Sequence, residues 1–504
     1  MPKRYIEKIL KARVYDVARE TPLDLAPNLS RRLGNRVLLK REDMQPVFSF
    51  KLRGAYNKII NLPEDKRRVG VIAASAGNHA QGVALAAHRL GIKALIVMPT
   101  TTPPIKVEAV KNLGAKTVVH GDTYDEAYAH ALKLAEEREM TFIHPYDDPD
   151  VIAGQGTVGM EILHQHTGDI HAIFVPVGGG GLIAGISAYV KYLYPGIKVI
   201  GVEPDEAPSL YQALEKKRRI RLPQVGIFTD GAAVRQVGKE PFRIARQCVD
   251  EVIVVNTDAI CAAIKDIFDD TRSIAEPAGA LAVAGLKKYV ELTGIQGTDL
   301  VAIESGANMN FDRLRHVTER AELGERREML VAVTIPERPG SFRDFCQAIG
   351  HRNITEFNYR MSDTKEAHVF AGIQVNHGDD ERLAILDQLN KGGYAVIDLT
   401  DNEMAKLHIR HMVGGHAPQI DNEKIYRFEF PERPGALLRF LTRMGRRWNI
   451  SMFHYRNHGD AYGRVLVGVQ VPSGSHGHFQ DFLKDLGYAF QDESANLAYT
   501  LFLS

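Results

Sequence analysis

The chain has 504 residues, of which 44% are hydrophobic and 25% charged. A chain of this length and composition is expected to form about two to four domains with buried cores, which excludes a disordered protein. The 63 basic residues nearly balance the 62 acidic ones, and the formal net charge of +1 provides no overall field for nucleic acid or an acidic membrane surface. Small molecules are therefore the expected partners.

The cysteines and the apolar runs of the chain indicate a cytoplasmic protein. The three cysteines, Cys248, Cys261 and Cys346, are spaced neither as metal ligands nor as a disulfide framework. The N-terminal segment carries scattered charges and has no apolar core of signal-peptide length, and no later run reaches the roughly 18 apolar residues of a membrane helix. We therefore expect a reducing compartment and no membrane segment.

Short apolar runs alternate with longer helical patterns from about residue 20 to residue 310. The runs are continuous and rich in Val and Ile, which is typical of strands buried on both faces of a parallel sheet. They cover residues 37–39, 69–74, 94–98, 117–119, 173–177, 199–202, 252–255 and 300–303. This part of the chain is predicted to be α/β, with any ligand beyond the carboxyl ends of the strands.

Lys51 follows the first of these strands after a turn, with Phe48 and Phe50 just before it. Residues 53–60 are predicted to begin a helix. Burial beside aromatic rings would lower the pKa of the Lys51 amine and make it nucleophilic, as in lysines that form imines with aldehydes. A solvated lysine at a helix start is the alternative that this stretch alone leaves open.

Small and polar segments follow three of the predicted strands. They are Ser75, Ala76, Gly77 and Asn78 after the second strand, Gly178, Gly179, Gly180, Gly181 and Leu182 after the fifth, and Glu304, Ser305, Gly306, Ala307 and Asn308 after the last. Consecutive glycines let backbone amides approach an anion at a helix N-terminus, and phosphate is the natural ligand. The pattern is neither a Walker loop nor a dinucleotide-binding fingerprint. Helix caps and a flexible turn are the ordinary alternatives.

Together these segments fit a phosphorylated aldehyde cofactor that bonds to a lysine. The motifs SFKLRGAYNK, SAGNHAQG, GGGGL and SGAN, in this order over residues 20–320, resemble those of the fold-type II pyridoxal-phosphate enzymes of the tryptophan synthase β family. Within it they are most similar to the threonine deaminases, or threonine ammonia-lyases. The resemblance implies a catalytic domain over residues 1–320 with pyridoxal 5'-phosphate as its cofactor.

The resemblance also implies roles for individual residues. Lys51 would bond to the cofactor and then remove the substrate α-proton. The segment from Gly178 to Leu182 would bind the phosphate. Asn78 would bond the ring hydroxyl, and Ser305 would face the pyridine nitrogen.

The substrate would be L-threonine, with L-serine second, and the products 2-oxobutanoate and ammonia, in the committed step of isoleucine biosynthesis. Backbone amides of Ser75, Ala76, Gly77 and Asn78 would hold the substrate carboxylate. Serine racemases resemble this family but have a serine in place of Ala76, which cannot transfer a proton, so racemisation should be weak. Some relatives bind a divalent cation at positions that correspond to Glu203, Ala207 and Ser209, but the serine replaces an acid and we expect no metal there.

Residues 313–330 are charge-dense with helical spacing and are predicted to lead out of the catalytic domain, with a connector at 321–328. An internal repeat follows, because PERPG recurs at 336–340 and 431–435, and FNYR at 357–360 returns as FHYR at 453–456. Each copy is expected to contain strand, turn, helix, two strands, helix and strand. This order resembles the ferredoxin-like α+β fold and, more closely, the paired ACT-like regulatory modules of biosynthetic threonine deaminases.

We expect one ACT-like module at 329–400, a linker at 401–421 and a second module at 422–504. The resemblance implies that isoleucine binds here and inhibits, that valine opposes it, and that the protein is a homotetramer. The expected effector neighbours are Phe357, Tyr359, Phe453 and Tyr455. Aromatic residues at alternating spacing are also typical of a sheet core.

Two alternatives remain open at this point. The first is another β-eliminating or β-replacing enzyme on the same scaffold, although Ala76 and the repeated modules count against a racemase and a sulfhydrylase. The second is an amino-acid-sensing binding protein with a vestigial catalytic half. Such a protein would have no need of Lys51, so the presence of the lysine counts against it.

Overall fold

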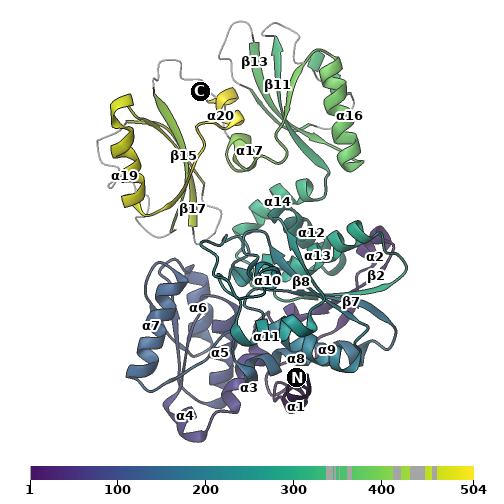
Figure 1. The fold of residues 1–504 in the computed structure, drawn as a ribbon, viewed down its shortest axis with the longest axis vertical. Coiled ribbons are helices and arrows are strands. Elements are labelled where there is room, and N and C mark those ends of the chain that lie inside the picture. Colours follow the sequence, from purple (N-terminus) through teal and green to yellow (C-terminus); the bar gives the residue numbers. More distant parts are fainter. Residues whose placement is uncertain are drawn as a thin grey trace. The chain divides into compact units, whose positions relative to one another are not determined.

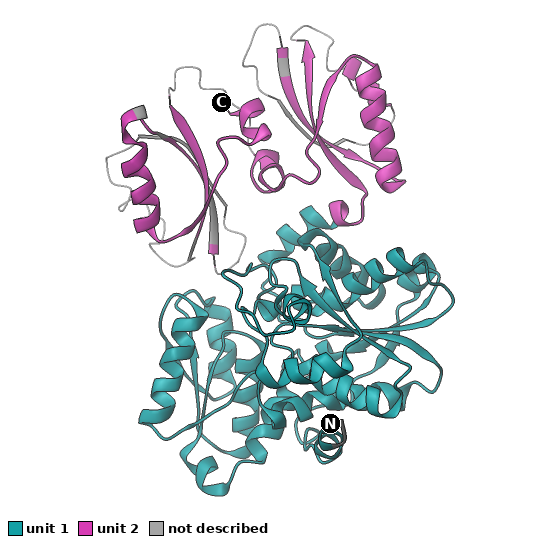
Figure 2. Ribbon diagram, in the orientation of Figure 1, with its two compact units in different colours: residues 1–321 teal, residues 322–504 magenta. Residues whose placement is uncertain are grey.

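The computed structural model describes residues 2–336, 344–345, 348–350, 352, 354–359, 366–411, 422–431, 449–456 and 462–503. The chain divides into two compact units, residues 1–321 and residues 322–504, which have different colours in Figure 2. Across the described residues, no helix combines the length and the apolar character needed to cross a membrane.

Unit 1 contains two sheets, and Figure 1 labels strands β2, β7 and β8 of the larger one. The strand order is β1-β2-β10-β7-β8-β9 in the larger sheet and β5-β4-β3-β6 in the smaller one. All neighbouring strands pair in parallel except β1 and β2. The strands are β1 (Leu23–Leu25), β2 (Arg36–Arg41), β3 (Val71–Ala74), β4 (Ala94–Met98), β5 (Lys116–Val119), β6 (Thr141–Phe142), β7 (Ile170–Pro176), β8 (Lys198–Pro204), β9 (Glu251–Val255) and β10 (Asp299–Glu304).

The helices of unit 1 begin at local signals in the sequence. Asn256 caps α12 through its side chain, and Thr123 and Glu126 form a capping box at the start of α7. The helices are α1 (Pro2–Leu10), α2 (Pro27–Leu33), η1 (Glu42–Met44), α3 (Lys51–Ile60), α4 (Glu64–Val69), α5 (Asn78–Leu90), α6 (Pro104–Asn112), α7 (Tyr124–Glu137), α8 (Pro149–Gln165), α9 (Gly181–Leu193), α10 (Ser209–Glu215), η2 (Asp230–Ala232), α11 (Lys239–Cys248), α12 (Thr257–Thr271), α13 (Pro277–Thr293) and α14 (Arg313–Gly324).

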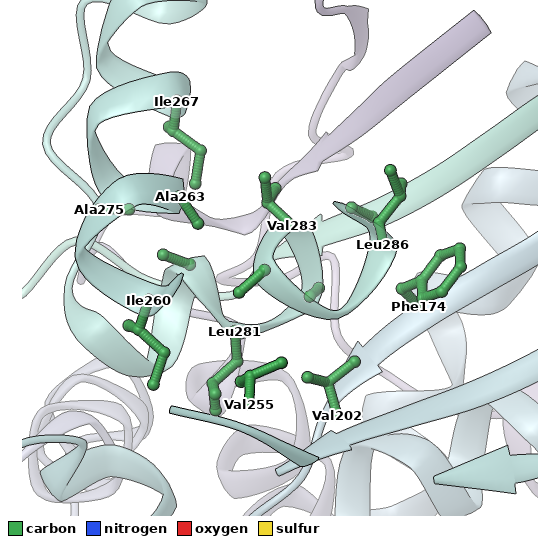
Figure 3. Packing of buried hydrophobic residues seen from close by; sticks show 14 of the residues in the cluster. Phe174, Val202, Val255, Ile260, Ala263, Ile267, Ala275, Leu281, Val283 and Leu286 are labelled. Atoms are coloured by element: carbon green, nitrogen blue, oxygen red, sulfur yellow. The ribbon is translucent and has the colours of Figure 1, made fainter. Parts of the chain in front are cut away.

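The larger sheet is buried on both faces, as the continuous apolar runs predict. On one face α12 and α13 pack on the strands, and Figure 3 shows Leu281 and Leu286 of α13 beside Phe174, Val202 and Val255. On the other face the strands pack against α8, α9 and α11. Each of the eight predicted runs contains a strand, so the α/β prediction for this part of the chain is confirmed.

Several local expectations were wrong. Val69 ends helix α4 instead of opening β3, because Gly70 has a φ of 113° and turns the chain there. Lys51 is already the first residue of α3, and the short strands β1 and β6 were not predicted. The helix predicted over 313–330 ends at Gly324, and Glu328 begins strand β11, where Arg410 pairs with its buried carboxylate at 3.3 Å.

Unit 2 contains two antiparallel four-stranded sheets with equivalent orders, β12-β13-β11-β14 and β16-β17-β15-β18. Phe357 lies opposite Ala371 in the first and Phe453 opposite Val467 in the second, so the repeats share a register. The repeat and the ferredoxin-like strand order are confirmed. The strands are β11 (Glu328–Pro336), β12 (Ile354–Tyr359), β13 (Glu366–Gln374), β14 (Ala395–Asp398), β15 (Glu423–Pro431), β16 (Asn449–Arg456), β17 (Tyr462–Gln470) and β18 (Ala489–Asp492).

The helices of unit 2 pack behind and between its sheets. They are α16 (Gly378–Lys391), α17 (Glu403–Leu407), η3 (Ile409–His411), η4 (Ser473–Ser475), α19 (His476–Leu486) and α20 (Leu497–Phe502). One core joins the two modules, with Leu330 and Phe370 from the first and Ile425, Leu466 and Phe502 from the second. The predicted loop at 412–419 and Cys346 lie outside the described residues, whereas Cys248 and Cys261 are buried.

Candidate active site

Lys51 occupies the first position of α3 and is half-buried. Its Nζ donates to the Pro145 carbonyl at 3.2 Å and lies 5.2 Å from the centre of the Phe50 ring. Burial lowers the pKa of the Lys51 amine to about 8, although attraction to the Glu276 carboxylate opposes this change. Because the neutral amine is a nucleophile, Lys51 is suited to attack a carbonyl carbon near neutral pH.

Backbone pairing places Ser305 next to the turn that carries Lys51. Ser49 and Gly306 form an isolated antiparallel bridge, and the Phe50 N–H donates to the Ser305 carbonyl at 3.4 Å. The Ser305 hydroxyl is buried and lies 3.2 Å from the Ala278 carbonyl, to which it donates. The carboxyl end of β10 is therefore tied to the start of α3.

The four glycines form a tight turn between β7 and α9. Gly180 has a φ of 89°, and a Cβ on Gly179 would lie 2.1 Å from a ring carbon of Tyr146. Among the described residues, the amides from Gly178 to Leu182 find no protein acceptor. Free amides at the start of a 13-residue helix, with the dipole of that helix, form an anion site. The turn therefore fits a cofactor phosphate.

Asn78 opens α5 and contacts two side chains that the sequence did not single out as site residues. Its Nδ2 donates to Glu276 Oε1 at 2.5 Å, and its Oδ1 accepts from Asn308 Nδ2 at 2.6 Å. Burial, and then the charge of Asp230, raises the pKa of Glu276 to about 7. Asn308 could be found from the sequence, because it ends the SGAN motif. Glu276 could not, because a residue before a proline at the first position of a helix is typical of an ordinary helix start.

Ser75, Ala76 and Gly77 form the turn between β3 and α5. The Gly77 N–H donates to Ser75 Oγ at 3.2 Å, and a Cβ on Gly77 would meet no atom within 4 Å. The amides of Ala76 and Asn78 donate to no described protein group, and they lie at the positive end of the 13-residue helix α5. The turn can therefore bind a carboxylate in the open space beside Gly77.

Two uncharged histidines support the segment that contacts Lys51 and Gly179. His79 Nε2 donates to the Ile143 carbonyl at 2.8 Å, and His144 Nδ1 accepts from the Tyr146 amide at 3.3 Å. Burial lowers the pKa of His79 to about 3 and that of His144 to about 4. Both rings are neutral at physiological pH, and their hydrogen bonds hold the backbone at Ile143 and at Tyr146.

The carboxylate of Glu203 is engaged at the start of α10. It accepts from the amides of Leu210 and Tyr211, both at 2.8 Å, and lies 3.4 Å from Ser209 Oγ. Burial raises the pKa of Glu203 to about 8, which favours its neutral form. In the described part of the chain, no group of three His, Cys, Asp or Glu residues is arranged to hold a metal ion.

The four aromatic residues proposed to lie near an effector are in edge strands of unit 2. Phe357 and Tyr359 lie in β12, and Phe453 and Tyr455 lie at the equivalent register in β16. Their side chains, and the residues 337–340 and 432–435 of the two Pro-Gly turns, lie outside what the structure describes. Their role stays a prediction.

Comparison with known proteins identifies the family. Residues 14–306 match the profile described as pyridoxal-phosphate dependent enzyme, and residues 319–409 and 414–503 match the C-terminal regulatory domain of threonine dehydratase. The chain is 58% identical over 503 residues to the biosynthetic L-threonine dehydratase of Burkholderia multivorans, with 99% of each chain covered.

Two solved structures resemble this chain over a share close to the size of unit 1. The processed form of threonine deaminase isoform 2 from Solanum lycopersicum is 52% identical with a TM-score of 0.63, over 64% of this chain and 93% of that chain. The threonine deaminase of T.th. is 38% identical with a TM-score of 0.58, over 61% of this chain and 99% of that chain. The chain belongs to the biosynthetic threonine dehydratases, pyridoxal-phosphate dependent enzymes of fold type II with a C-terminal regulatory domain.

Proposed function

We propose that this protein converts L-threonine to 2-oxobutanoate and ammonia, the committed step of isoleucine biosynthesis, with L-serine as a secondary substrate. The observation that carries this proposal is the grouping of the desolvated Lys51 amine, the free amides of the glycine turn and Ser305 at strand ends of unit 1. These groups provide the amine, the anion site and the ring partner that pyridoxal 5'-phosphate requires. Similarity to a threonine dehydratase over the whole chain supports the choice of substrate.

Pyridoxal phosphate supplies an electron sink that allows the bonds at Cα and Cβ of an amino acid to break. Lys51 would hold the cofactor through its amine, and the same Nζ would accept the α-proton of the substrate. The amides from Gly178 to Leu182 would bind the phosphate. Asn78 would donate to the ring hydroxyl, and Ser305 would face the pyridine nitrogen.

The turn from Ser75 to Asn78 holds the substrate carboxylate through backbone amides. Loss of the α-proton and of the β-hydroxyl removes one water and yields 2-aminobut-2-enoate. This product tautomerises to the imine, takes up one water and releases ammonia, so threonine is converted to 2-oxobutanoate and ammonia with no net gain or loss of water. The methyl group of Ala76 neither donates nor accepts a proton, so racemisation is weak.

We propose that isoleucine inhibits the enzyme through unit 2 and that valine opposes it. The two ferredoxin-like sheets have equivalent edge strands, and Phe357, Tyr359, Phe453 and Tyr455 occupy equivalent positions on them. We place the regulatory modules at 329–400 and 422–504, with the catalytic domain at 1–320, and propose a cytoplasmic homotetramer.

The test is a visible absorption spectrum of the full-length protein, followed by assay of 2-oxobutanoate with threonine, with and without isoleucine. Lys51→Ala is assayed beside Lys111→Ala, which removes an exposed lysine that pairs with Glu108 at 2.8 Å. We expect Lys51→Ala to abolish turnover and the imine band while leaving the fold intact, and Lys111→Ala to behave as wild type.

A cofactor band with threonine-dependent keto-acid release that isoleucine suppresses would support both parts of the proposal. A Lys51→Ala variant that deaminates threonine at the original rate would remove Lys51 from the mechanism. A colourless protein that resists reconstitution and still binds isoleucine would instead indicate the amino-acid sensor.

A further inference from the structure

Asn78 belongs to a series of hydrogen bonds that runs from a backbone carbonyl to a buried carboxyl group. Asn308 Nδ2 donates to the Val47 carbonyl at 2.9 Å and to Asn78 Oδ1 at 2.6 Å. Asn78 Nδ2 in turn donates to Glu276 Oε1 at 2.5 Å. These bonds connect the segment before α3, the segment after β10, and the starts of α5 and α13.

The Val47 carbonyl determines the direction of every bond in this series. A carbonyl oxygen only accepts, so the Asn308 atom that faces it is the amide nitrogen. The same nitrogen faces Asn78, whose nearer atom is therefore its carbonyl oxygen, and the Asn78 nitrogen is left to face Glu276. The Asn78 amide is thus held in one of its two orientations by contacts on both sides.

One N–H of Asn78 Nδ2 has no acceptor among the described residues. We propose that Asn308 and Glu276 are positioning residues that direct this N–H to the ring hydroxyl oxygen of pyridoxal phosphate. This inference rests on the contact proposed above between Asn78 and that hydroxyl. An ionised ring oxygen is stabilised by an N–H and repelled by a carbonyl oxygen in the same place. Reversal of the Asn78 amide would therefore replace an attractive contact by a repulsive one.

The packing of Glu276 indicates that its carboxyl group serves to hold Asn78 and not to cap a helix. Glu276 precedes α13, yet its side chain makes no capping hydrogen bond with that helix and is 5% exposed. A Cβ on Gly306 would lie 2.7 Å from Glu276 Oε1. The carboxyl group therefore has room beside Asn78 because position 306 has no side chain.

The test is cofactor binding by the full-length protein, measured by titrating the cofactor-free form with pyridoxal phosphate and recording the absorption of the bound cofactor. Loss of one hydrogen bond to a charged group corresponds to roughly tenfold or greater loss of affinity, which we expect for Asn78→Ala and for Asn308→Leu. Because Asn308 acts through Asn78, the double variant should bind no more weakly than Asn78→Ala alone. The control is Asn61→Ala at the far end of α3, which removes a donor to the Asn57 carbonyl at 2.8 Å and should bind as wild type.

Glu276 is tested with two substitutions of similar volume. Glu276→Gln keeps an oxygen that can accept from Asn78 and should retain affinity within about threefold, whereas Glu276→Leu should lose about as much as Asn308→Leu. The absorption maximum of the bound cofactor is recorded in each case, because it responds to the ring oxygen contact and not to general loosening of the fold.

Two results would overturn the inference and leave the proposed function intact. One is an Asn308→Leu variant that binds the cofactor as tightly as wild type. The other is a double variant whose loss of affinity is the product of the two single losses. Wild-type protein that forms no cofactor band would overturn the proposed function and this inference together.

Discussion

Lys51 differs in its partners from the buried arginine two positions later on the same helix. Arg53 pairs with Glu42 at 2.7 Å and with Glu161 at 2.5 Å, whereas Lys51 forms no ion pair with any described residue. Nearby carboxylates stabilise a cation, so a buried lysine without a close one releases its proton more easily. Burial lowers the pKa of Lys51 to about 8, because only the weaker attraction to the Glu276 carboxylate opposes the loss of solvent.

We predict that covalent uptake of pyridoxal phosphate by the cofactor-free protein accelerates as the pH rises to about 8 and then levels off. Below this pKa the neutral fraction of Lys51 grows roughly tenfold per pH unit, and above it the amine is already neutral. Rapid mixing with detection of the imine band measures the rate. Nα-acetyllysine in the same buffers controls for titration of the cofactor itself. A rate that still rises toward pH 10, as for an ordinary lysine, would contradict the shifted pKa.

At this scale the sequence could indicate residues that belong to local motifs. Lys51 stands between aromatic and helical segments, and the glycine turn is visible as a run of one residue type. Glu276 could not be found in this way, because its partner Asn78 is 198 residues distant in the chain. The same holds for Tyr146, whose ring is recognised as the neighbour of Gly179 only once β6 and β7 are placed.

At the scale of elements, a buried ion network holds α3 against its neighbours. Arg53 of α3 pairs with Glu42 of η1 and with Glu161 of α8, and Lys40 of β2 pairs with Glu161 at 2.7 Å. All four side chains are buried, and their charges balance. Because Lys51 begins the same helix, this network also fixes the direction in which Lys51 enters the site.

Arg53→Ala should lower the free energy of unfolding by about 3–5 kcal/mol, because it leaves two buried carboxylates without their main partner. Urea unfolding of the full-length protein measures the change. The matched control is Arg68→Ala, which removes an arginine whose pair with Glu64 is exposed and which should leave stability unchanged. Equal effects of the two substitutions would show that the network contributes no more than a surface ion pair.

Gly179→Ala tests the turn between β7 and α9. The new methyl group would overlap the Tyr146 ring, so the ring or the turn must move and the amides lose their alignment on the phosphate. We expect roughly tenfold weaker binding of pyridoxal phosphate in a titration followed by absorbance. Gly196→Ala adds a methyl group with no atom within 4 Å and should bind normally. Normal binding by Gly179→Ala as well would show that the turn tolerates a side chain.

At the scale of the whole molecule, the sequence predicted a catalytic part and a repeated C-terminal part because the repeat is visible in the residues themselves. The expected catalytic domain, residues 1–320, ends within one residue of unit 1, although the helical pattern of α14 continues past that point. In the structure Val317 and Ala321 pack in the core of unit 1, whereas Leu323 packs in the core of unit 2. Burial of individual side chains, which the pattern does not reveal, decides the boundary.

A protein that ends at Glu322 should therefore keep the core of unit 1 complete and omit Leu323, whose partners lie in unit 2. All residues proposed to contact the cofactor or the substrate lie in unit 1, so we expect this protein to bind pyridoxal phosphate and to release 2-oxobutanoate from threonine. It should no longer respond to isoleucine, because both ferredoxin-like sheets are absent. The measurement is an isoleucine titration of initial rates for the shortened and the full-length proteins. Inhibition that persists in the shortened protein would place the effector site in unit 1 and not on the repeated sheets.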